Sequence, residues 1–217
     1  MTSTPQQQNP QHSQQLKRAT CSRCRRPSSH CYCHLIRSVS NRTAVLIIQH
    51  PLEQKNAKGT ARLLNLCLEN SQLLVAEQFA DAELKALLDQ PYFNLLLYPS
   101  PNDDKHNISC LSPTLILKNP AQYNLEQKPL RLILLDGTWR KSRKLLHCNP
   151  RLAALPRLTL EQIPASRYHI RKAHKPEQLS TFEACAEALK EIETLNTSAL
   201  LKSFDEFIET FISKTGD

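Results

Sequence analysis

Residues 130–149 carry the side chains that bear most directly on chemistry, and their sequence is LRLILLDGTWRKSRKLLHCN. The apolar run at 130–135 has the length and composition of a buried strand. The tetrapeptide DGTW at 136–139 follows it at once. In open α/β sheets, ligands bind at the carboxyl ends of the strands. We therefore expect a carboxylate, a hydroxyl and the chain's single indole to lie at a binding site.

Positive charge is concentrated in two parts of the chain. Residues 1–60 contain nine Lys and Arg against one acid, and residues 131–175 contain eleven against two. The second block includes four cations in a helix-like segment directly after the tetrapeptide: Arg140, Lys141, Arg143 and Lys144. If both blocks lie on one face, that face attracts a polyanion. We favour a nucleic-acid-binding face over scattered solubilising charge.

Four of the eight cysteines fall within thirteen residues near the N-terminus. Cys21 and Cys24 form a Cys-x2-Cys pair, and Cys31 and Cys33 form a Cys-x-Cys pair. Four soft thiolates suit tetrahedral zinc, and a metal would supply folding energy to a segment with little apolar content. We therefore predict a zinc-binding knuckle over residues 19–40. A redox Cys-x-x-Cys site is less favoured, because no thioredoxin-like strand precedes the first pair.

The residues around the cysteines leave the ligand set slightly open. His30 and His34 are close enough in sequence to replace a thiolate. Arginines also surround the cysteines, and we expect Arg23, Arg25 and Arg26 to contact phosphate.

The rest of the chain alternates between strand-like and helix-like segments. Strands are predicted at 43–49, 72–76, 93–98, 130–135 and 158–160, and helices at 58–68, 81–88, 179–195 and 198–212, with one more after the tetrapeptide. This alternation indicates an α/β fold with a mostly parallel sheet, in which the strand ends near His50, Tyr98 and Asp136 converge. Residues 101–113 are polar and turn-rich, so they are predicted to form a loop.

Composition excludes several classes of protein. With three glycines, the chain cannot build a Walker loop or a dinucleotide-binding turn. No stretch approaches the ~20 apolar residues of a membrane span, and no signal-peptide core is present. We expect a soluble, cytoplasmic protein without membrane contact or an obligate protein partner. Residues 1–18 are predicted to be a disordered tail.

Residues 179–184, with the sequence LSTFEA, begin a predicted helix. Ser180 and Glu183 fit a capping box. A helix start also directs free N–H groups outward, which suits a carboxylate or phosphate, and Arg171 precedes this one closely. On the residues alone, a binding site and a well-capped helix are both open.

Taken in order, these segments resemble the DTW-domain family. The match comprises His50-Pro51, Tyr98-Pro99, DGTW at 136–139, YHIRK at 168–172 and LSTFEA at 179–184, after the cysteine knuckle. It covers about residues 19–200. A lone DxTW motif is a weak signal, whereas all of these blocks in order are a strong one.

Within that family the chain looks like the bacterial tRNA-uridine aminocarboxypropyltransferases. The resemblance implies that residues 41–217 form a SPOUT-like α/β catalytic domain, with a C-terminal knot that holds S-adenosylmethionine. It implies that tRNA is the partner. The reaction implied is transfer of the 3-amino-3-carboxypropyl group of S-adenosylmethionine to N3 of a tRNA uridine, which leaves methylthioadenosine.

The resemblance also implies roles for the matching residues. Asp136 is the candidate base for uracil N3–H, although it could instead cap the following helix. Thr138 is expected to orient Asp136 or the uracil edge, and Trp139 to stack on the uracil or pack on the methionine chain unless it belongs to the core. Arg171 is the candidate for the transferred carboxylate.

Further candidates follow from the same match. The other cofactor-binding candidates are Leu97, Tyr98, Pro99, Leu135, Ser180 and Thr181. The candidates for RNA binding are Arg23, Arg25, Arg26, Arg140, Lys141, Arg143, Lys144, Arg167 and Lys172.

Two other functions stay open. An RNA methyltransferase would share the fold class, the cofactor and the basic face. It would differ only in which carbon of S-adenosylmethionine is aligned with the attacking atom of the RNA. A non-catalytic RNA-binding protein with a zinc knuckle would explain the charge and the cysteines. It would leave the DGTW tetrapeptide at a strand end without a purpose.

Overall fold

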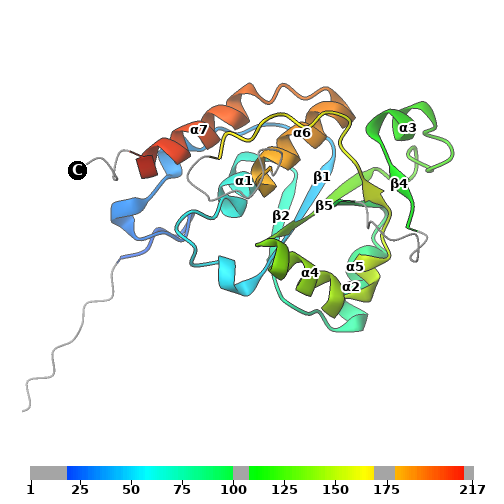
Figure 1. The fold of residues 1–217 in the computed structure, drawn as a ribbon, viewed down its shortest axis with the longest axis horizontal. Helices are drawn as coiled ribbons and strands as arrows, with labels where there is room; N and C mark the ends of the chain where they lie inside the picture. The colour runs from blue at the N-terminus through cyan, green and yellow to red at the C-terminus, as the bar shows by residue number, and fades with distance from the viewer. Residues whose placement is uncertain (1–18, 100–107, 169–178, 213–217) are drawn as a thin grey trace, which may run out of the picture.

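The chain folds around a six-stranded sheet with the strand order β2-β1-β5-β3-β6-β4 (Figure 1). This is a computed structural model, and it describes residues 19–99, 108–168 and 179–212. Every strand pair in the sheet is parallel. The predicted α/β fold with a mostly parallel sheet is therefore confirmed. The predicted tail at 1–18 lies outside the described residues.

Every predicted strand and helix has an observed counterpart close to its range, and the structure adds elements that the sequence does not predict. The strands are Ala44–Gln49 (β1), Ser71–Val75 (β2), Phe93–Leu97 (β3), Cys110–Leu111 (β4), Leu130–Asp136 (β5) and Arg157–Leu158 (β6). The α-helices are Ala61–Cys67 (α1), Asp81–Leu88 (α2), Pro113–Lys118 (α3), Trp139–Cys148 (α4), Pro150–Ala153 (α5), Thr181–Glu193 (α6) and Ser198–Ile212 (α7). Short 3-10 helices occupy Ser28–His30 (η1), Cys33–Leu35 (η2) and Pro51–Glu53 (η3).

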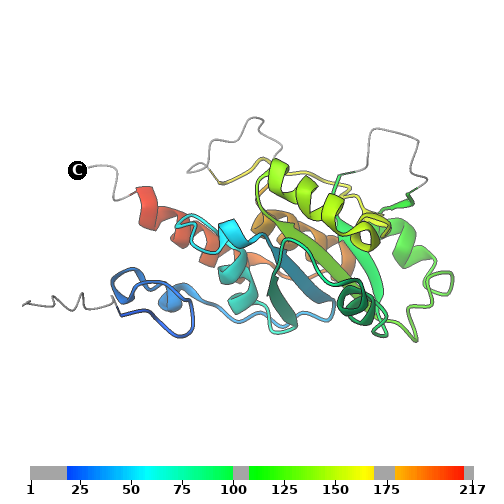
Figure 2. The same cartoon turned by 90° about the horizontal axis from the view of Figure 1, so that it is seen from below.

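The two central strands are buried along their whole length because helices cover both faces of the sheet. Val45 and Ile47 of β1 point into a cluster with residues of α1, α6 and α7. Leu46 and Ile48 point the other way, into a cluster with residues of α2, α4 and α5. Figure 1 shows the sheet between these helical layers, and Figure 2 views the molecule from the side of α2 and α4. Burial on both faces explains why β1 and β5 read as continuous apolar runs.

The segment predicted to be a loop at 101–113 contains regular structure, so that prediction is wrong for its described part. Cys110 and Leu111 form the edge strand β4, and Ser112 then caps α3 by accepting a hydrogen bond from the backbone N–H of Leu115 at 3.2 Å. A strand of two residues shows no alternation in the sequence. These two residues form a strand because they pair with β6.

The cysteine knuckle packs into the core of the main domain. Tyr32 meets Phe207 of α7 edge to face, with ring centroids 5.4 Å apart. Arg37 forms a two-pronged ion pair with Glu206 of the same helix, at 2.9 and 2.8 Å. Cys24 and Tyr32 belong to the same hydrophobic cluster as Phe207. The predicted regions 19–40 and 41–217 therefore share one core.

None of the helices in the described ranges has both the length and the apolar character needed to cross a bilayer.

Candidate functional site

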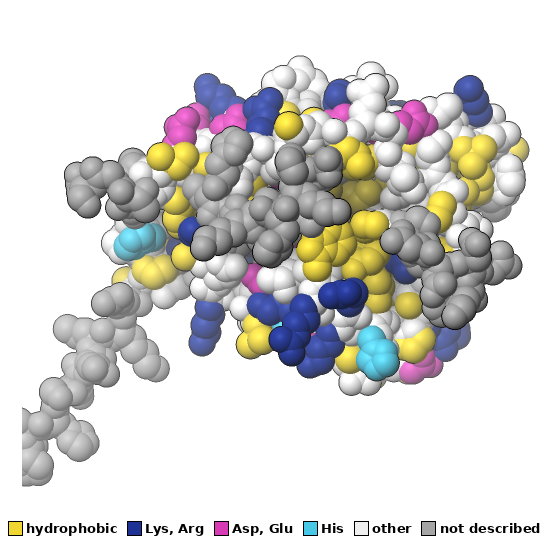
Figure 3. Space-filling model, viewed as in Figure 1, with side chains coloured by type: hydrophobic (Ala, Val, Ile, Leu, Met, Phe, Trp, Pro, Cys, Tyr) yellow, Lys and Arg dark blue, Asp and Glu magenta, His cyan; other side chains and the backbone are white. Residues whose placement is uncertain are grey.

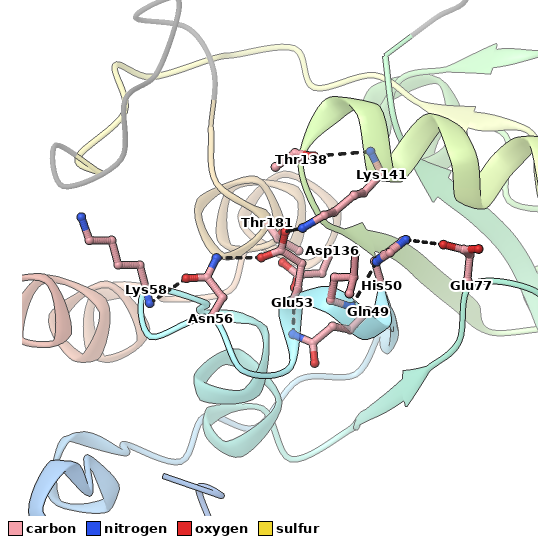
Figure 4. A network of polar contacts seen from close by, with 11 residues as sticks. Gln49, His50, Glu53, Asn56, Lys58, Glu77, Asp136, Thr138, Lys141 and Thr181 are labelled. Carbon is pink, nitrogen blue, oxygen red and sulfur yellow. Dashed lines mark hydrogen bonds and ion pairs between the residues drawn. The ribbon is translucent and has the colours of Figure 1, made fainter. Parts of the chain in front are cut away.

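The carboxylate of Asp136 is held from two sides at the carboxyl edge of the sheet (Figure 4). Gln49 Nε2 donates to Oδ2 at 2.9 Å, and Thr181 Oγ1 donates to Oδ1 at 2.9 Å. Gln49 stands opposite Asp136 in the register of β1 and β5, and Thr181 is the first residue of α6. Asp136 is only 7% exposed. Both donors and the positive end of the α6 dipole stabilise a negative charge there.

The side chain that caps α4 is that of Thr138. Its Oγ1 accepts a hydrogen bond from the backbone N–H of Lys141 at 3.4 Å. Gly137 permits this tight turn, because a Cβ at that position would lie 3.0 Å from the Cβ of Lys141. The capping role considered for Asp136 is therefore filled by Thr138, while the carboxylate bonds to β1 and α6.

Trp139 and Tyr98 form an aromatic pair on the β3 side of Asp136. Their ring centroids are 5.7 Å apart in an edge-on arrangement. The Tyr98 hydroxyl lies 3.2 Å from Ser142 Oγ, and the buried Arg157 guanidinium lies 5.4 Å from the Tyr98 ring centroid. Trp139 is 45% exposed, so placing it in the core would be wrong. Ser142 and Arg157 hold the side chain of Tyr98 in place, whereas the partly exposed indole of Trp139 is open to a ligand.

A buried ion pair between η3 and α4 borders the site, and it was not predicted. Lys141 Nζ lies 2.7 Å from Glu53 Oε1, and Asn56 Nδ2 donates to Glu53 Oε2 at 2.7 Å. The Glu53 side chain is 6% exposed and that of Lys141 27%. No motif contains Glu53. Its one sequence signal is that it is the only acid in residues 1–60.

Several predicted RNA-binding cations are engaged within the protein. Lys144 pairs with Glu77 at 2.8 Å, and its hydrogen bond holds the pKa of Glu77 below the ordinary value. Arg167 pairs with Asp205 at 2.8 Å. By contrast, Arg140 and Arg143 are exposed and make no ion pair or hydrogen bond through their side chains within the described ranges. These two therefore remain available to a partner.

The predicted capping box at the start of α6 is confirmed. Ser180 Oγ accepts from the Glu183 N–H, and the Glu183 carboxylate accepts from the Ser180 N–H at 2.8 Å. The same carboxylate also accepts from Ser166 Oγ and from the backbone N–H of Arg167, so it ties that segment to the helix. The cap is thus structural and also fixes Thr181 beside Asp136. Arg171 and Lys172 lie outside the described residues.

The four knuckle thiols converge on one point. Their sulfur atoms all lie within 4.8 Å of one another, with Cys21 to Cys33 at 3.6 Å and Cys24 to Cys31 at 3.7 Å. Zinc–sulfur bonds of ~2.3 Å in a tetrahedron place sulfur atoms ~3.8 Å apart, whereas a disulfide needs ~2.05 Å. Neighbouring backbone N–H groups lower the pKa of Cys21 to about 6, whereas burial and the neighbouring thiols raise the pKa of Cys33 to about 12. Cys21 therefore gives the thiolate, the form that binds metal, more readily than Cys33 does. The arrangement suits one tetrahedral cation.

The two candidate histidine ligands are not part of this sulfur cluster. His30 and His34 are both exposed, and His30 Nδ1 lies 2.9 Å from Ser29 Oγ. Among the described residues, the group able to hold a metal consists of the four cysteines.

Comparison with protein families matches the DTW domain over residues 18–212. The chain belongs to the DTW-domain family. Its DTW domain is 31% identical over 188 residues to tRNA-uridine aminocarboxypropyltransferase 2 of Drosophila melanogaster, covering 82% of this chain and 68% of that protein. It is 30% identical over 187 residues to the enzyme of the same name in Mus musculus, covering 83% and 58%.

A plant relative is more distant. tRNA-uridine aminocarboxypropyltransferase A of Arabidopsis thaliana is 28% identical over 138 residues, covering 60% of this chain and 51% of that protein. The DTW domain thus spans about half to two thirds of the length of these relatives. They come from animals and a plant, so they do not bear on the bacterial subgroup. No solved structure gives a significant match.

The Glu53–Lys141 pair generates a stability prediction for this DTW domain. Lys141→Ala should lower the free energy of unfolding by about 2 to 3 kcal/mol, because it leaves a buried carboxylate without its cation. The matched control Lys144→Ala removes a surface pair with side chains 55% and 35% exposed, and should cost less than about 1 kcal/mol. Urea unfolding followed by circular dichroism measures both.

A double variant, Glu53→Gln with Lys141→Met, should recover most of the loss because no charge is then buried. Equal losses for Lys141→Ala and Lys144→Ala would contradict a structural role for the Glu53 pair.

Proposed function

We propose that this protein transfers the 3-amino-3-carboxypropyl group of S-adenosylmethionine to N3 of a tRNA uridine. Membership of the DTW-domain family and relatives that carry the corresponding enzyme name support the reaction. The observation that carries it in the structure is the carboxylate of Asp136, held at the strand end of the DGTW signature beside an exposed aromatic pair.

The residues beside Asp136 fit a donor with an adenosine ring and an amino-acid chain. S-adenosylmethionine supplies a carbon that its sulfonium already activates. Trp139 offers an open ring face, and backbone at Leu97, Tyr98, Pro99 and Leu135 flanks it at the adjacent ends of β3 and β5. We assign the donor to this side, and Arg171 to the transferred carboxylate.

We further propose a SPOUT-like fold in which the C-terminal segments form a knot around the donor. The all-parallel sheet and the α6 N-terminus beside Asp136 support this assignment. So does the scarcity of glycine, since a Walker or dinucleotide loop is ruled out and the donor must be held by other loops.

In the proposed mechanism Asp136 would accept the N3 proton as N3 attacks the carbon bonded to the sulfonium. The N3–carbon bond would form as the carbon–sulfur bond breaks, and the sulfur would leave as methylthioadenosine. Gln49 and Thr181 hold its two oxygens in a fixed plane, which limits the orientations from which it takes a proton. Burial strengthens these hydrogen bonds relative to water. Thr138 fixes the start of α4, so the backbone that carries Asp136 and Trp139 stays in place during the reaction.

We assign the tRNA backbone to the exposed cations near α4 and the knuckle. In the space-filling view, basic side chains gather over α4 beside a hydrophobic area (Figure 3). Arg140 and Arg143 suit phosphate contacts best, since Lys141 and Lys144 pair with Glu53 and Glu77. Arg23 and Arg25 on the knuckle are exposed as well.

We assign structural zinc to the four knuckle thiols, as their spacing supports. We also place the protein in the cytoplasm, because all eight cysteines are free thiols and such chains persist in reducing compartments.

The reaction is tested by its products. Purified protein, S-adenosylmethionine and unfractionated tRNA should yield methylthioadenosine and 3-(3-amino-3-carboxypropyl)uridine, which mass spectrometry of digested nucleosides detects. S-adenosylhomocysteine together with a methylated base would instead establish a methyltransferase. Unchanged tRNA and donor would refute transfer.

The role of Asp136 is tested by Asp136→Asn, which keeps the shape but removes the proton acceptor. Turnover should fall by ~10² to 10⁴, with tRNA and donor affinities nearly intact. Turnover of the wild type should rise with pH as the base or N3 deprotonates, and the variant should depend on pH more steeply. Asp89→Asn, at an exposed position directly after α2, is the matched control and should leave turnover unchanged. A folded Asp136→Asn variant within a few-fold of wild type would show that Asp136 is not the base.

The zinc assignment predicts about one zinc per chain in protein purified without added metal. Cys31→Ser with Cys33→Ser should abolish it, whereas Cys110→Ser, at an exposed cysteine outside the cluster, should not. Elemental analysis measures both, and full zinc retention in the double variant would overturn the assignment.

The assignment of the RNA face predicts the salt dependence of tRNA binding. Arg140→Ala with Arg143→Ala should reduce the slope of log affinity against log salt by about 1.4 to 1.8, because two phosphate contacts no longer release counterions. Arg42→Ala with Lys118→Ala, two exposed cations elsewhere, should leave the slope unchanged. An equal slope for the two double variants would place the RNA on another surface.

A further inference from the structure

A pocket of about 420 Å³ lies between the cysteine knuckle and the carboxyl end of β1. The knuckle side contributes Arg25, Arg26 and Tyr32, and the other wall is formed by the chain from Gln49 to Arg62. Its volume falls within the ~300–1,000 Å³ typical of small-ligand pockets. Of the residues that the structure describes, neither the DGTW tetrapeptide nor Tyr98 lines it, so it is separate from the proposed donor side.

The lining of this pocket carries a net positive charge. Its three arginines are Arg25, Arg26 and Arg62, and the one carboxylate among its lining residues, Glu53, is already paired with Lys141. Arg26 donates to the backbone oxygens of Asn56 and Ala57 and lies 5.6 Å from the centroid of the Tyr32 ring, and no carboxylate of the described residues pairs with it. In the part of the chain that the structure describes, Arg25 and Arg62 have no ion-pair partner. Such a lining selects an anion.

One residue that lines the pocket, Gln49, is hydrogen-bonded to the proposed base. Its side chain donates from Nε2 to Asp136 Oδ2 at 2.9 Å. In Figure 4 the amide oxygen of Gln49 points away from Asp136. A ligand that reaches Gln49 from the pocket therefore arrives beside Asp136 from the β1 side.

The order of the strands separates this pocket from the aromatic pair. β5 lies between β1 and β3, so Asp136 has Gln49 on one side and the Tyr98–Trp139 pair on the other. Displacement at carbon requires the nucleophile and the leaving group on opposite sides of the transferred carbon. With the donor on the β3 side, the acceptor belongs on the β1 side.

We propose that this pocket binds the acceptor nucleotide of the RNA, with its phosphate held by Arg25 and Arg62 and its base directed past Gln49 towards Asp136. The inference rests on the proposed function, because the acceptor is placed on the β1 side only if the donor lies on the β3 side. The knuckle then acts as one wall of the acceptor site, in addition to holding its metal.

The test compares Arg25→Gln with Arg62→Gln, as a double variant, against Arg42→Gln. Arg42 is an exposed arginine before the opposite end of β1, with a side chain 85% exposed. The double variant should raise KM for unfractionated tRNA about tenfold or more, because charge-assisted hydrogen bonds to phosphate are lost. The affinity for S-adenosylmethionine should not change, and Arg42→Gln should behave as wild type. Unaltered zinc content and thermal unfolding show that the knuckle is intact.

A binding titration independent of turnover completes the test. Uridine 5′-monophosphate should bind the wild type more tightly than uridine does, and the double variant should lose that difference. Nucleotide binding and KM equal to those of Arg42→Gln would overturn the acceptor assignment, as would weakened S-adenosylmethionine binding. Failure of the wild type to modify tRNA would refute the proposed function instead, and the titration would still decide the pocket.

Discussion

The parallel register of β1 against β5 is the constraint on which the site depends. It sets Gln49 opposite Asp136, with Ile48 opposite Leu135 immediately before. A slip of one residue would exchange the β1 side chains between the two apolar clusters, each of which is packed around particular side chains, so core packing on both faces holds the register. The hydrogen bond at the strand ends is therefore a product of core packing. The start of α6 adds the second donor, Thr181, from the other direction.

The sequence was sufficient for the elements that have long periodic or apolar runs. It predicted β1 and β5 because strands buried on both faces are continuous apolar runs. It predicted α6 and α7 because a helix buried on one side carries an apolar stripe at helical spacing. It missed β4, whose two residues become a strand only by pairing with β6. It also missed Glu53 and Arg62 as residues of the site region, because their significance arises from contacts between segments distant in sequence. Local motifs marked Asp136 and the cysteines, since each motif concentrates its chemistry within a few residues.

The cations that follow the tetrapeptide differ in their partners. The basic block after the tetrapeptide reads as one uniform surface, yet alternate positions have opposite fates. Lys141 and Lys144 turn back to Glu53 and Glu77, while Arg140 and Arg143 face outward. Residues one apart on a helix point in different directions, so a run of cations cannot be assigned to a single partner. The acids that neutralise half of the run lie in other elements, beyond the reach of a local pattern.

The docking of the knuckle on α7 has a consequence for how the chain matures. Arg37 and Glu206, which join the two, are 169 residues apart in sequence. During synthesis the four cysteines emerge early, and the proposed zinc would let them close before the rest of the domain is made. The aromatic surface of Tyr32 stays exposed to water until Phe207 has been made. The knuckle is therefore synthesised early but can dock only after α7 has been made. Its arginines reach their final positions at that late stage.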